Sequence, residues 1–447
     1  MYSCGPTVSD FPHIGNLRAY VFVDILRRTL EFNGYKVNHV MNITDVGHLT
    51  SQADTGEDKM EAASKREKKD AWQIAKFYEK EFLRALEKLN ILKPQIICRA
   101  TEHIKEMIDL VKKLEEKGFA YRISDGIYFD TSKLSDYGKL ANMPRSKILA
   151  GARIEVVSGK RHPTDFALWK FSPKEGLKRQ MEWDSPWGVG FPGWHIECSA
   201  MGMKYLNEHF DIHTGGVDHV LIHHTNEIAQ NEAVTGHQVV NYWIHNEFLL
   251  VERQKMSKSL RNFYNIHDIE EKGFNALSLR YLFLTCHYRS KMNFTWKGLE
   301  AAQNAYNKLV GIIKDWQHGE REVVSPEDVK KIDDFRKKFQ EKINDDLNIP
   351  EALAIVWEVA KSNIPDPDKL DLILDFDQVL GLDLERVSRE SRASRVPQEI
   401  TELVEKREEL RKQGRWDEAD KIRKEIEKSG FTIKDTPKGP KVKKKVL

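Results

Sequence analysis

The sequence predicts an α/β fold with a parallel β-sheet near its N-terminus and helical regions after it. The first observation is the order strand, glycine-bearing loop, helix and strand at the start of the chain. There a helix pattern runs from Asn16 to Gly34, and Val37–Ile43 follows as a strand. The second observation is the same order later on, where Phe210–Thr214 and Val239–His245 flank another helix pattern. Such alternation is typical of βαβ units, whose strands form a parallel sheet.

An α+β segment separates the two halves of the predicted sheet. Apolar residues at helical spacing over 74–86 and 104–111 predict two helices. The alternating stretches Ala120–Ile123 and Ile127–Asp130, joined by a turn that contains Asp125 and Gly126, predict a β-hairpin. The insertion therefore combines helices with antiparallel strands.

The C-terminal part is helical in pattern from Trp296 onward. Pro350, Pro365 and Pro367 are expected to break helices, and the Ser/Arg-rich stretch Ser388–Arg395 is expected to form a linker. The predicted domains are a sheet domain (1–95 and 193–246), an insertion (96–192), a connecting region (247–297), a helical bundle (298–394) and a small final domain (395–447).

Composition indicates a folded protein of about three domains, with 447 residues, 40% apolar and 31% charged. Because no run of about 18 apolar residues and no secretory signal occurs, we expect a cytoplasmic protein without a membrane partner. The net charge of +2 neither favours nor excludes nucleic acid, but residues 401–447 hold fifteen basic and ten acidic residues, a local charge of +5. The four cysteines are too scattered for a disulfide framework.

Two short motifs have the chemistry of a phosphate site. Pro12–Asn16 stands at a predicted helix start, where backbone N–H groups attract anions, Gly15 lets a phosphate approach and His13 can donate a hydrogen bond. Lys255–Ser259 contains two lysines three residues apart, which can clamp a leaving pyrophosphate. Each motif alone is more often ordinary, a capping loop in the first case and a solvated basic loop in the second.

Four residues have the chemistry of a tetrahedral zinc site. Cys198 offers a thiolate, His223 and Glu227 share one helix face, and Cys4 could offer a second thiolate from the opening loop. Spacing alone does not prove the set, because the two cysteines are far apart in the chain. The alternative is a set of buried cysteines under a histidine-rich surface that also includes His209, His213, His219 and His224.

Taken in order, these motifs resemble the cysteinyl-tRNA synthetases, a family of class I aminoacyl-tRNA synthetases. Cys4–Val8 is similar to the family's opening motif, Pro12–Asn16 to its HIGH signature, and Lys255–Ser259 is its KMSKS signature unchanged. Further similar segments are Ala150–Lys170, Pro192–Met201, His213–Asp218, His223–Gln230, Trp416–Asp420 and Asp435–Gly439. The resemblance spans nearly the whole chain and implies a Rossmann-type catalytic domain, a C-terminal anticodon-binding domain and a monomer.

The resemblance implies ATP-dependent ligation of L-cysteine to cysteine tRNA through a cysteinyl-adenylate, with Mg²⁺ accompanying ATP. It implies one Zn²⁺ per chain, which would select cysteine because zinc binds a thiolate better than a hydroxyl. The implied zinc ligands are Cys4, Cys198, His223 and Glu227. The implied catalytic and ATP-binding residues are His13, Gly15, Asn16, Asp218, Lys255 and Lys258, and the implied amino-acid contacts are Thr44 and Trp194.

Three departures from the family pattern bear on these roles. Asn16 replaces the last histidine of HIGH, and Thr225 replaces a glutamate in the family's HHENE run without removing a proposed ligand. The chain begins three residues before Cys4, which predicts a short first strand. Two alternatives remain open. One is a cysteine ligase that acts on an amino sugar and lacks the terminal tRNA unit, and the other is an inactive tRNA-binding paralogue.

The final domain contains four candidate tRNA contacts. If the segment from Trp416 is helical, Trp416 and Asp420 share one face, so that the ring could stack on an anticodon base and the carboxylate could accept from a guanine edge. Asp435, expected in a turn, is a second acceptor, and Arg411 can hold a phosphate or a base. The alternative is that Trp416 packs in the core of the domain and Asp420 pairs with a lysine one turn on.

Overall fold

The structure, a computed structural model, describes residues 1–47, 58–143, 157–172, 179–256, 260, 262–317, 324–393, 398–436 and 439–444. The chain forms two compact units. The first comprises Met1–Tyr306, Asp334–Glu358 and Gln378–Leu382, and the second comprises Asn307–Asp333, Val359–Asp377 and Asp383–Leu447. No helix in the described part of the chain combines the length and the apolar character needed to cross a membrane.

A five-stranded parallel sheet forms the centre of the first unit, in the order β3-β2-β1-β8-β9. Its strands are β1 (Tyr2–Ser3), β2 (Val40–Ile43), β3 (Ile96–Arg99), β8 (Phe210–Gly216) and β9 (Val240–Asn246). The chain moves outward in one direction from β1 and in the other from β8. The strand order thus reverses between β1 and β8, and ligands of such sheets bind at the carboxyl ends of the strands near this point.

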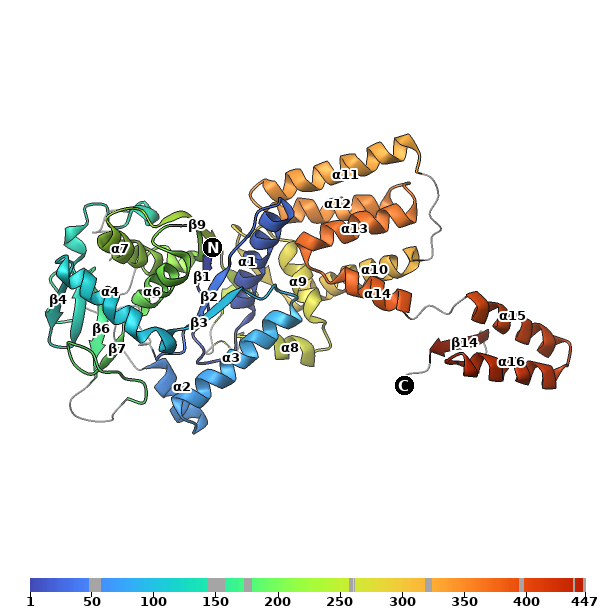
Figure 1. The fold of residues 1–447 in the computed structure, drawn as a ribbon, viewed down its shortest axis with the longest axis horizontal. Coiled ribbons are helices and arrows are strands. Elements are labelled where there is room, and N and C mark those ends of the chain that lie inside the picture. Colours follow the sequence, from blue (N-terminus) through green and yellow to red (C-terminus); the bar gives the residue numbers. More distant parts are fainter. Residues whose placement is uncertain are drawn as a thin grey trace. The chain divides into compact units, whose positions relative to one another are not determined.

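Helices cover both faces of the sheet (Figure 1). One face carries α1 (Ile14–Phe32) and α3 (Ala71–Lys88), and the other carries α6 (Trp194–Leu206) and α7 (His223–Thr235). Right-handed crossovers require this arrangement, because the strand order advances in opposite directions on the two sides of β1. The prediction of a parallel α/β sheet is confirmed. The expected short first strand is also present, since β1 has two residues.

The insertion contains an antiparallel sheet in the order β4-β5-β6-β7. The predicted hairpin is β4 (Ala120–Ile123) and β5 (Gly126–Phe129), and β6 (Phe166–Phe171) and β7 (Gly190–Pro192) complete the sheet. Residue 96 was the wrong start for this insertion, because β3 pairs with β2 in the parallel sheet. The helix α4 (Ile104–Glu116) packs against α6 and α7 of the sheet domain. The other domain boundaries stay predictions.

The first unit also contains several short elements outside the five-stranded sheet. They are α2 (Lys59–Glu67), β10 (Leu249–Val251), β11 (Gln254–Lys255), α8 (Ile266–Glu271), α9 (Ala276–Leu284) and β12 (Met292–Phe294). The strands form a three-stranded sheet in the order β11-β10-β12. This small sheet brings Lys255, the first residue of the second phosphate motif, to the end of a hairpin.

The helical prediction from Trp296 onward is confirmed, and helices end shortly before Pro350 and Pro365, as expected. The helices are α10 (Trp296–Trp316), α11 (Pro326–Asn344), α12 (Ile349–Lys361), α13 (Asp366–Leu380) and α14 (Leu384–Ala393). Pro350 and Pro367 lie in first turns and Pro365 directly precedes one, where proline's missing N–H costs nothing. The expected linker is wrong over Ser388–Ala393, which belongs to α14.

The final domain has its own small core. Its elements are α15 (Gln398–Lys412), α16 (Trp416–Lys428), β13 (Phe431–Thr436) and β14 (Gly439–Lys444). Ile400, Ile422, Ile426 and Phe431 are buried together between the two helices and the hairpin.

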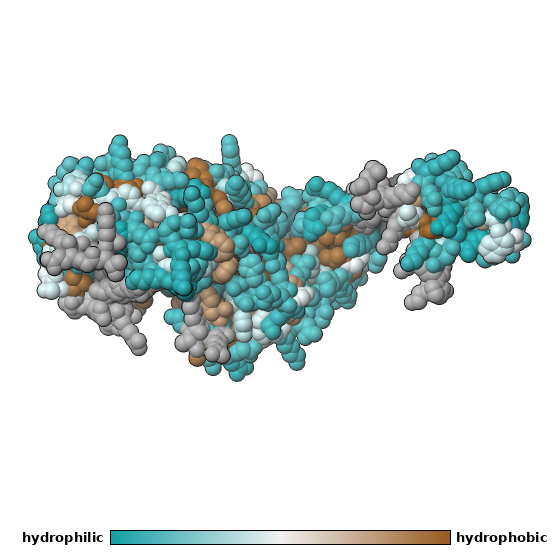
Figure 2. All heavy atoms as spheres, turned by 90° about the horizontal axis from the view of Figure 1, so that it is seen from below, coloured by the Kyte–Doolittle hydropathy of each residue, from teal (hydrophilic) through white to brown (hydrophobic). Residues whose placement is uncertain are grey.

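Hydrophilic residues predominate on the face of the molecule drawn in Figure 2.

Candidate active site

A cavity of ≈ 680 Å³ lies at the carboxyl ends of β1 and β8, where the strand order reverses. Its lining includes ten of the residues that the sequence singled out. These are Cys4, His13, Gly15, Asn16, Thr44, Trp194, Cys198, Asp218, His223 and Lys255. Glu227 is fully buried beside this lining, within 3.0 Å of His223, and Lys258 lies outside the described residues. The structure therefore brings the zinc candidates and the described phosphate candidates to one cavity.

The first turn of α1 is held by a reciprocal pair of hydrogen bonds. His13 is the N-cap, and its Nδ1 accepts from the backbone N–H of Asn16 at 3.1 Å, while the Asn16 Oδ1 accepts from the backbone N–H of His13 at 3.2 Å. Burial lowers the pKa of His13 to about 4, so the ring is neutral at pH 7. With Nδ1 accepting, the ring proton lies on Nε2, which can donate to a ligand.

Gly15 lets the start of α1 approach the second phosphate motif. A Cβ at this position would lie 2.5 Å from the Cε of Met256, the residue after Lys255. Only a glycine therefore permits this contact without a shift of the methionine. Ser257, Lys258 and Ser259 of that motif lie outside the described residues.

The four zinc candidates form one compact, largely buried group. The ligand atoms of Cys4, Cys198, His223 and Glu227 all lie within 4.8 Å of one another. The two sulfur atoms are 3.8 Å apart, which is about the spacing of two thiolates on one tetrahedral zinc with Zn–S bonds near 2.3 Å. The chemistry and spacing of these donors fit a zinc ion.

A second group of possible ligands overlaps the first, because Cys4 and Glu227 also meet His213 and His224. His213 Nε2 lies 2.8 Å from Glu227 Oε2, and His224 Nε2 lies 3.5 Å from Cys4 Sγ. The alternative of a histidine-rich surface is wrong for His213, His223 and His224, which are all buried. His209, in contrast, is exposed.

Burial and mutual charge set the protonation of this group. Burial raises the pKa of the Cys4 thiol to about 11, and the bond with Cys4 together with burial raises that of Cys198. Burial opposes the charged forms of His223 and Glu227, but their mutual attraction raises the pKa of His223 to about 10. The neighbouring histidines His213 and His223 hold the pKa of Glu227 below its usual range. The group therefore contains an anionic carboxylate at neutral pH.

Several residues that support the site were missed by the sequence reasoning. Asn42 accepts from the backbone N–H of Gly5 at 2.8 Å and donates to the Thr44 hydroxyl at 3.1 Å, and Thr44 donates to Glu197 at 2.9 Å. His195 Nδ1 lies 2.9 Å from His223 Nδ1, which turns the Nε2 of His223 toward Glu227. Asn42 could have been identified from the sequence, because it is a polar residue near the carboxyl end of a buried strand. No spacing pattern in the sequence marks His195 as a residue of the site.

Trp194 covers the group from the first turn of α6. Its ring centroid is 4.6 Å from that of His223, and the Lys59 ammonium lies 5.6 Å from the Trp194 ring. Asp218 stands in a short 3₁₀ helix (Val217–His219) at the end of β8 and is exposed to the cavity. The predicted amino-acid and nucleotide residues thus line the same cavity.

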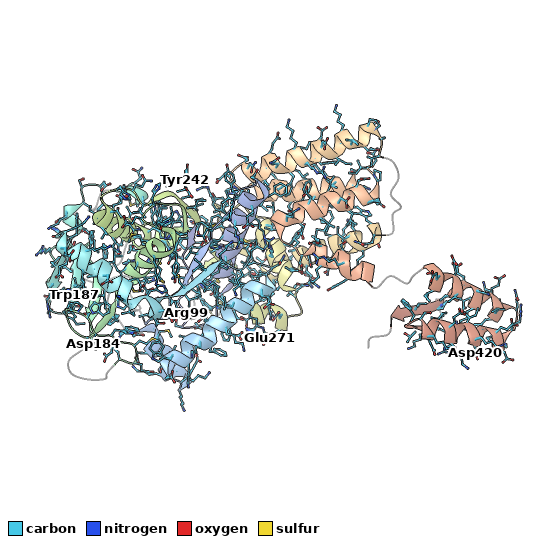
Figure 3. The ribbon with its side chains drawn as sticks, in the orientation of Figure 1. Arg99, Asp184, Trp187, Tyr242, Glu271 and Asp420 are labelled. Carbon is cyan, nitrogen blue, oxygen red and sulfur yellow. The ribbon has the colours of Figure 1, made fainter. Side chains whose placement is uncertain are left out.

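The four tRNA candidates all belong to the small C-terminal domain. Trp416 is 59% exposed, so the alternative that it packs in the core is wrong, and Asp420 projects from the same helix, α16 (Figure 3). Asp435 lies in β13 and not in the expected turn, and it accepts hydrogen bonds from Arg407 at 2.9 and 3.0 Å. Arg411 pairs with Asp435 at 2.7 Å, so these two candidates already contact each other.

Comparison with known proteins identifies the class. The family described as "tRNA synthetases class I (C) catalytic domain" matches residues 1–304, "DALR domain" matches 338–362, and "Cysteinyl-tRNA ligase anticodon binding domain" matches 393–442. A methionyl-tRNA synthetase of Mycobacterium tuberculosis, solved with methionyl-adenylate, superposes with a TM-score of 0.59 at 15% identity, covering 87% of this chain and 89% of that one. A LeuRS of Agrobacterium radiobacter gives 0.61 at 12% identity, covering 87% and 85%. Fold and family match define a class I aminoacyl-tRNA synthetase.

Curated relatives narrow this class to one amino acid. The chain is 51% identical to "Cysteine--tRNA ligase 1" of Burkholderia lata, over 99% of this chain and 92% of that protein. It is 44% identical to the cysteine–tRNA ligase of Treponema denticola, over 97% and 93%. The chain belongs to the cysteine–tRNA ligase family and is an enzyme that joins cysteine to tRNA. The match of residues 393–442 also disfavours the amino-sugar alternative, which would lack this domain.

Proposed function

We propose that the chain forms cysteinyl-adenylate from L-cysteine and ATP, and then transfers the cysteinyl group to cysteine tRNA. The observation that best supports these two reaction steps is the shared cavity, which is lined both by the paired thiols and by the first turn of α1. One substrate group can thus be held at the zinc candidates while ATP contacts the start of the helix. Catalysis is then mainly positioning and charge stabilisation.

We propose Cys4, Cys198, His223 and Glu227 as the ligands of one zinc ion. We favour this set over the overlapping one because it contains two thiolates, which soft divalent metals prefer. When bound, the ion would recognise the substrate thiolate and reject a hydroxyl. His213 holds Glu227 through its second oxygen, and His195 orients the His223 ring, as outer partners of metal ligands commonly do.

The remaining residues of the cavity bind and orient the reactants. The Thr44 hydroxyl donates to Glu197 and accepts from Asn42, so it can only accept a further hydrogen bond, which suits the ammonium group of the amino acid. In adenylate formation a carboxylate oxygen of cysteine attacks the α-phosphorus of ATP, and pyrophosphate leaves with its electron pair. The neutral His13 can donate through Nε2 to a phosphate oxygen, and we assign the leaving pyrophosphate to Lys255 and Lys258, with Mg²⁺ accompanying ATP.

Cysteine-dependent exchange of pyrophosphate into ATP tests the proposal directly. We expect exchange with cysteine, about one zinc per chain by elemental analysis, and exchange with serine lower by about 10⁴-fold, the size of discrimination that a dedicated polar contact supplies. An absence of exchange in zinc-containing protein would favour the inactive paralogue instead. Cysteine-dependent exchange without zinc would contradict the metal assignment alone.

A further inference from the structure

The start of α1 is tied to the chain just after the second phosphate motif. The backbone N–H of Ile14 donates to the Tyr264 carbonyl at 2.8 Å, and His13 forms an isolated antiparallel bridge with Asn265. The rings of His13 and Phe263 meet edge to face with centroids 4.7 Å apart. The first phosphate motif is therefore anchored to the segment that follows the second one.

One turn further along α1, Arg18 contacts the segment that precedes the second phosphate motif. Its guanidinium donates to the carbonyls of Glu247 at 2.7 Å and Phe248 at 3.0 Å, directly before β10. It also donates to the carbonyls of His287 at 3.1 Å and Ser290 at 2.7 Å. The hairpin of β10 and β11 leads from this corner to Lys255, so both flanks of the motif are held by the same helix.

Arg18 is an unusual residue in this position because it is a buried charge held by carbonyl groups. It is 3% exposed, and burial lowers its pKa. No ion pair with a carboxylate occurs for it among the residues described here. Only the planar, multiply donating guanidinium can serve four carbonyls on two segments at once, which a lysine cannot do. The cost of burying the charge is thus offset by hydrogen bonds with one defined geometry.

The corner that Arg18 holds is itself bonded together. The backbone N–H of Glu247 donates to the Tyr288 carbonyl at 2.8 Å, and that of Met292 donates to the Phe248 carbonyl at 3.0 Å. Glu247 and Phe248 also line the cavity. Arg18 therefore fixes a preformed wall of the cavity relative to the first turn of α1.

We propose that Arg18 is a positioning residue that sets the separation between the two phosphate motifs, an inference that rests on the proposed ATP site. Its loss would let the hairpin that carries Lys255 shift against His13 and Gly15. A displacement of about 1 Å at a reacting centre costs about 100-fold in rate. The zinc candidates contact other elements and should keep their geometry.

The test compares Arg18→Gln and Arg18→Lys in the full-length, zinc-containing enzyme. For Arg18→Gln we expect kcat of pyrophosphate exchange to fall about 10- to 100-fold and KM for ATP to rise, with KM for cysteine within about two-fold of wild type. Arg18→Lys keeps the charge but lacks the planar guanidinium, so its kcat and its KM for ATP should lie between those of wild type and Arg18→Gln. Independently of activity, amide hydrogen exchange over residues 247–256 should become faster in Arg18→Gln.

Arg280→Lys is the matched control, because Arg280 is also buried and contacts α1. It pairs with Asp24 and donates to the carbonyls of Leu380 and Leu89. We expect it to lower Tm without changing KM for ATP or amide exchange over 247–256. The proposal is overturned if Arg18→Gln lowers Tm yet leaves those two quantities unchanged, or if Arg280→Lys reproduces its effects. If the proposed function is wrong, the wild-type enzyme will show no cysteine-dependent pyrophosphate exchange. Amide hydrogen exchange will still test the role of Arg18 in that case.

Discussion

The active-site cavity and the C-terminal domain build their functional surfaces in opposite ways. The zinc candidates come from three places in the chain, the loop after β1 and the helices α6 and α7, and Cys198, His223 and Glu227 are at most 3% exposed. The tRNA candidates come from neighbouring elements, and Trp416 and Asp420 are exposed. The zinc candidates are thus enclosed by other parts of the chain, whereas Trp416 and Asp420 face solvent.

This difference predicts how the two regions respond to substitution. Removing one partner of a buried polar group leaves the others unsatisfied, which is costly. Removing an exposed side chain costs little stability, so its effect measures the contact with a ligand. The cavity should therefore show large, coupled effects and the small domain smaller, separable ones.

The largest effect is expected for Cys198→Ser. A hydroxyl is a poor zinc ligand, so the bound zinc should fall from about one per chain to near zero. Discrimination of cysteine from serine in pyrophosphate exchange should then drop from about 10⁴-fold to the 10- to 100-fold that pocket size alone supplies. Cys98→Ser is the matched control, because Cys98 is buried and donates to the Met41 carbonyl outside the group. Equal zinc loss in both variants would contradict the assignment of Cys198 as a ligand.

A smaller effect within the same region is expected for Lys258→Ala. Adenylate formation should slow by about 10²- to 10³-fold, the usual cost of one transition-state donor. The affinity for cysteine, measured by calorimetry, should hardly change, because the substrate thiol is expected to bind at the zinc candidates and not at Lys258. Lys291→Ala, which removes an exposed lysine directly before β12, should leave the rate unchanged. If cysteine affinity falls as much as the rate, Lys258 has a structural role.

The sequence predicted the sheet, its helices and the meeting of the zinc candidates because each depends on a strong pattern. Helical spacing identifies elements such as α3, and the resemblance to a family joined Cys4 to Cys198 across the chain, which spacing could not do. The supporting residues were missed because no local pattern marks them. Asn42 and His195 act through partners that only the folded chain brings near, and Arg18 looks like any polar residue on an amphipathic helix.

The errors have a similar physical origin. The Ser/Arg-rich stretch was expected to be a linker, but its first part continues α14, where Glu390 pairs with Arg386 and Arg389 with Glu385 of the preceding turn. Asp435 was expected in a turn, and its pairing with Arg407 and Arg411 in β13 was not visible from the sequence.

On the small domain, Asp420→Ala should affect only the step that involves tRNA. Loss of a base contact should reduce kcat/KM for aminoacylation by about 1–3 kcal/mol, while pyrophosphate exchange without tRNA stays unchanged. Asp417→Ala, which removes another exposed carboxylate of α16, is the control. Equal activity of wild type on cysteine tRNA and on a tRNA with its first anticodon base replaced would refute anticodon reading by this domain.

The smallest effect is expected at Asp435, which sharpens the contrast with the cavity. The hydrogen bond from Arg407, opposed by burial and aided by Arg411, lowers the pKa of Asp435 to about 2. Because its pKa in the unfolded chain is higher, near 3.9, the ion pairs stabilise the domain above that value and are lost as the pH falls toward 2. The carboxylate is 45% exposed, so solvent screening reduces the contribution to about 0.2–1 kcal/mol.

Amide hydrogen exchange over residues 431–436 can measure this contribution in the full-length enzyme. At pH 7 and low salt, Asp435→Asn should lower the free energy of local opening by less than about 1 kcal/mol, and 1 M salt should shrink the difference. Between pH 4 and pH 2, after correction for intrinsic exchange, wild type should converge on the variant. A salt-independent loss of several kcal/mol would mean that Asp435 is as tightly coupled as the buried residues of the cavity. The two regions would then not differ in the way that their exposure predicts.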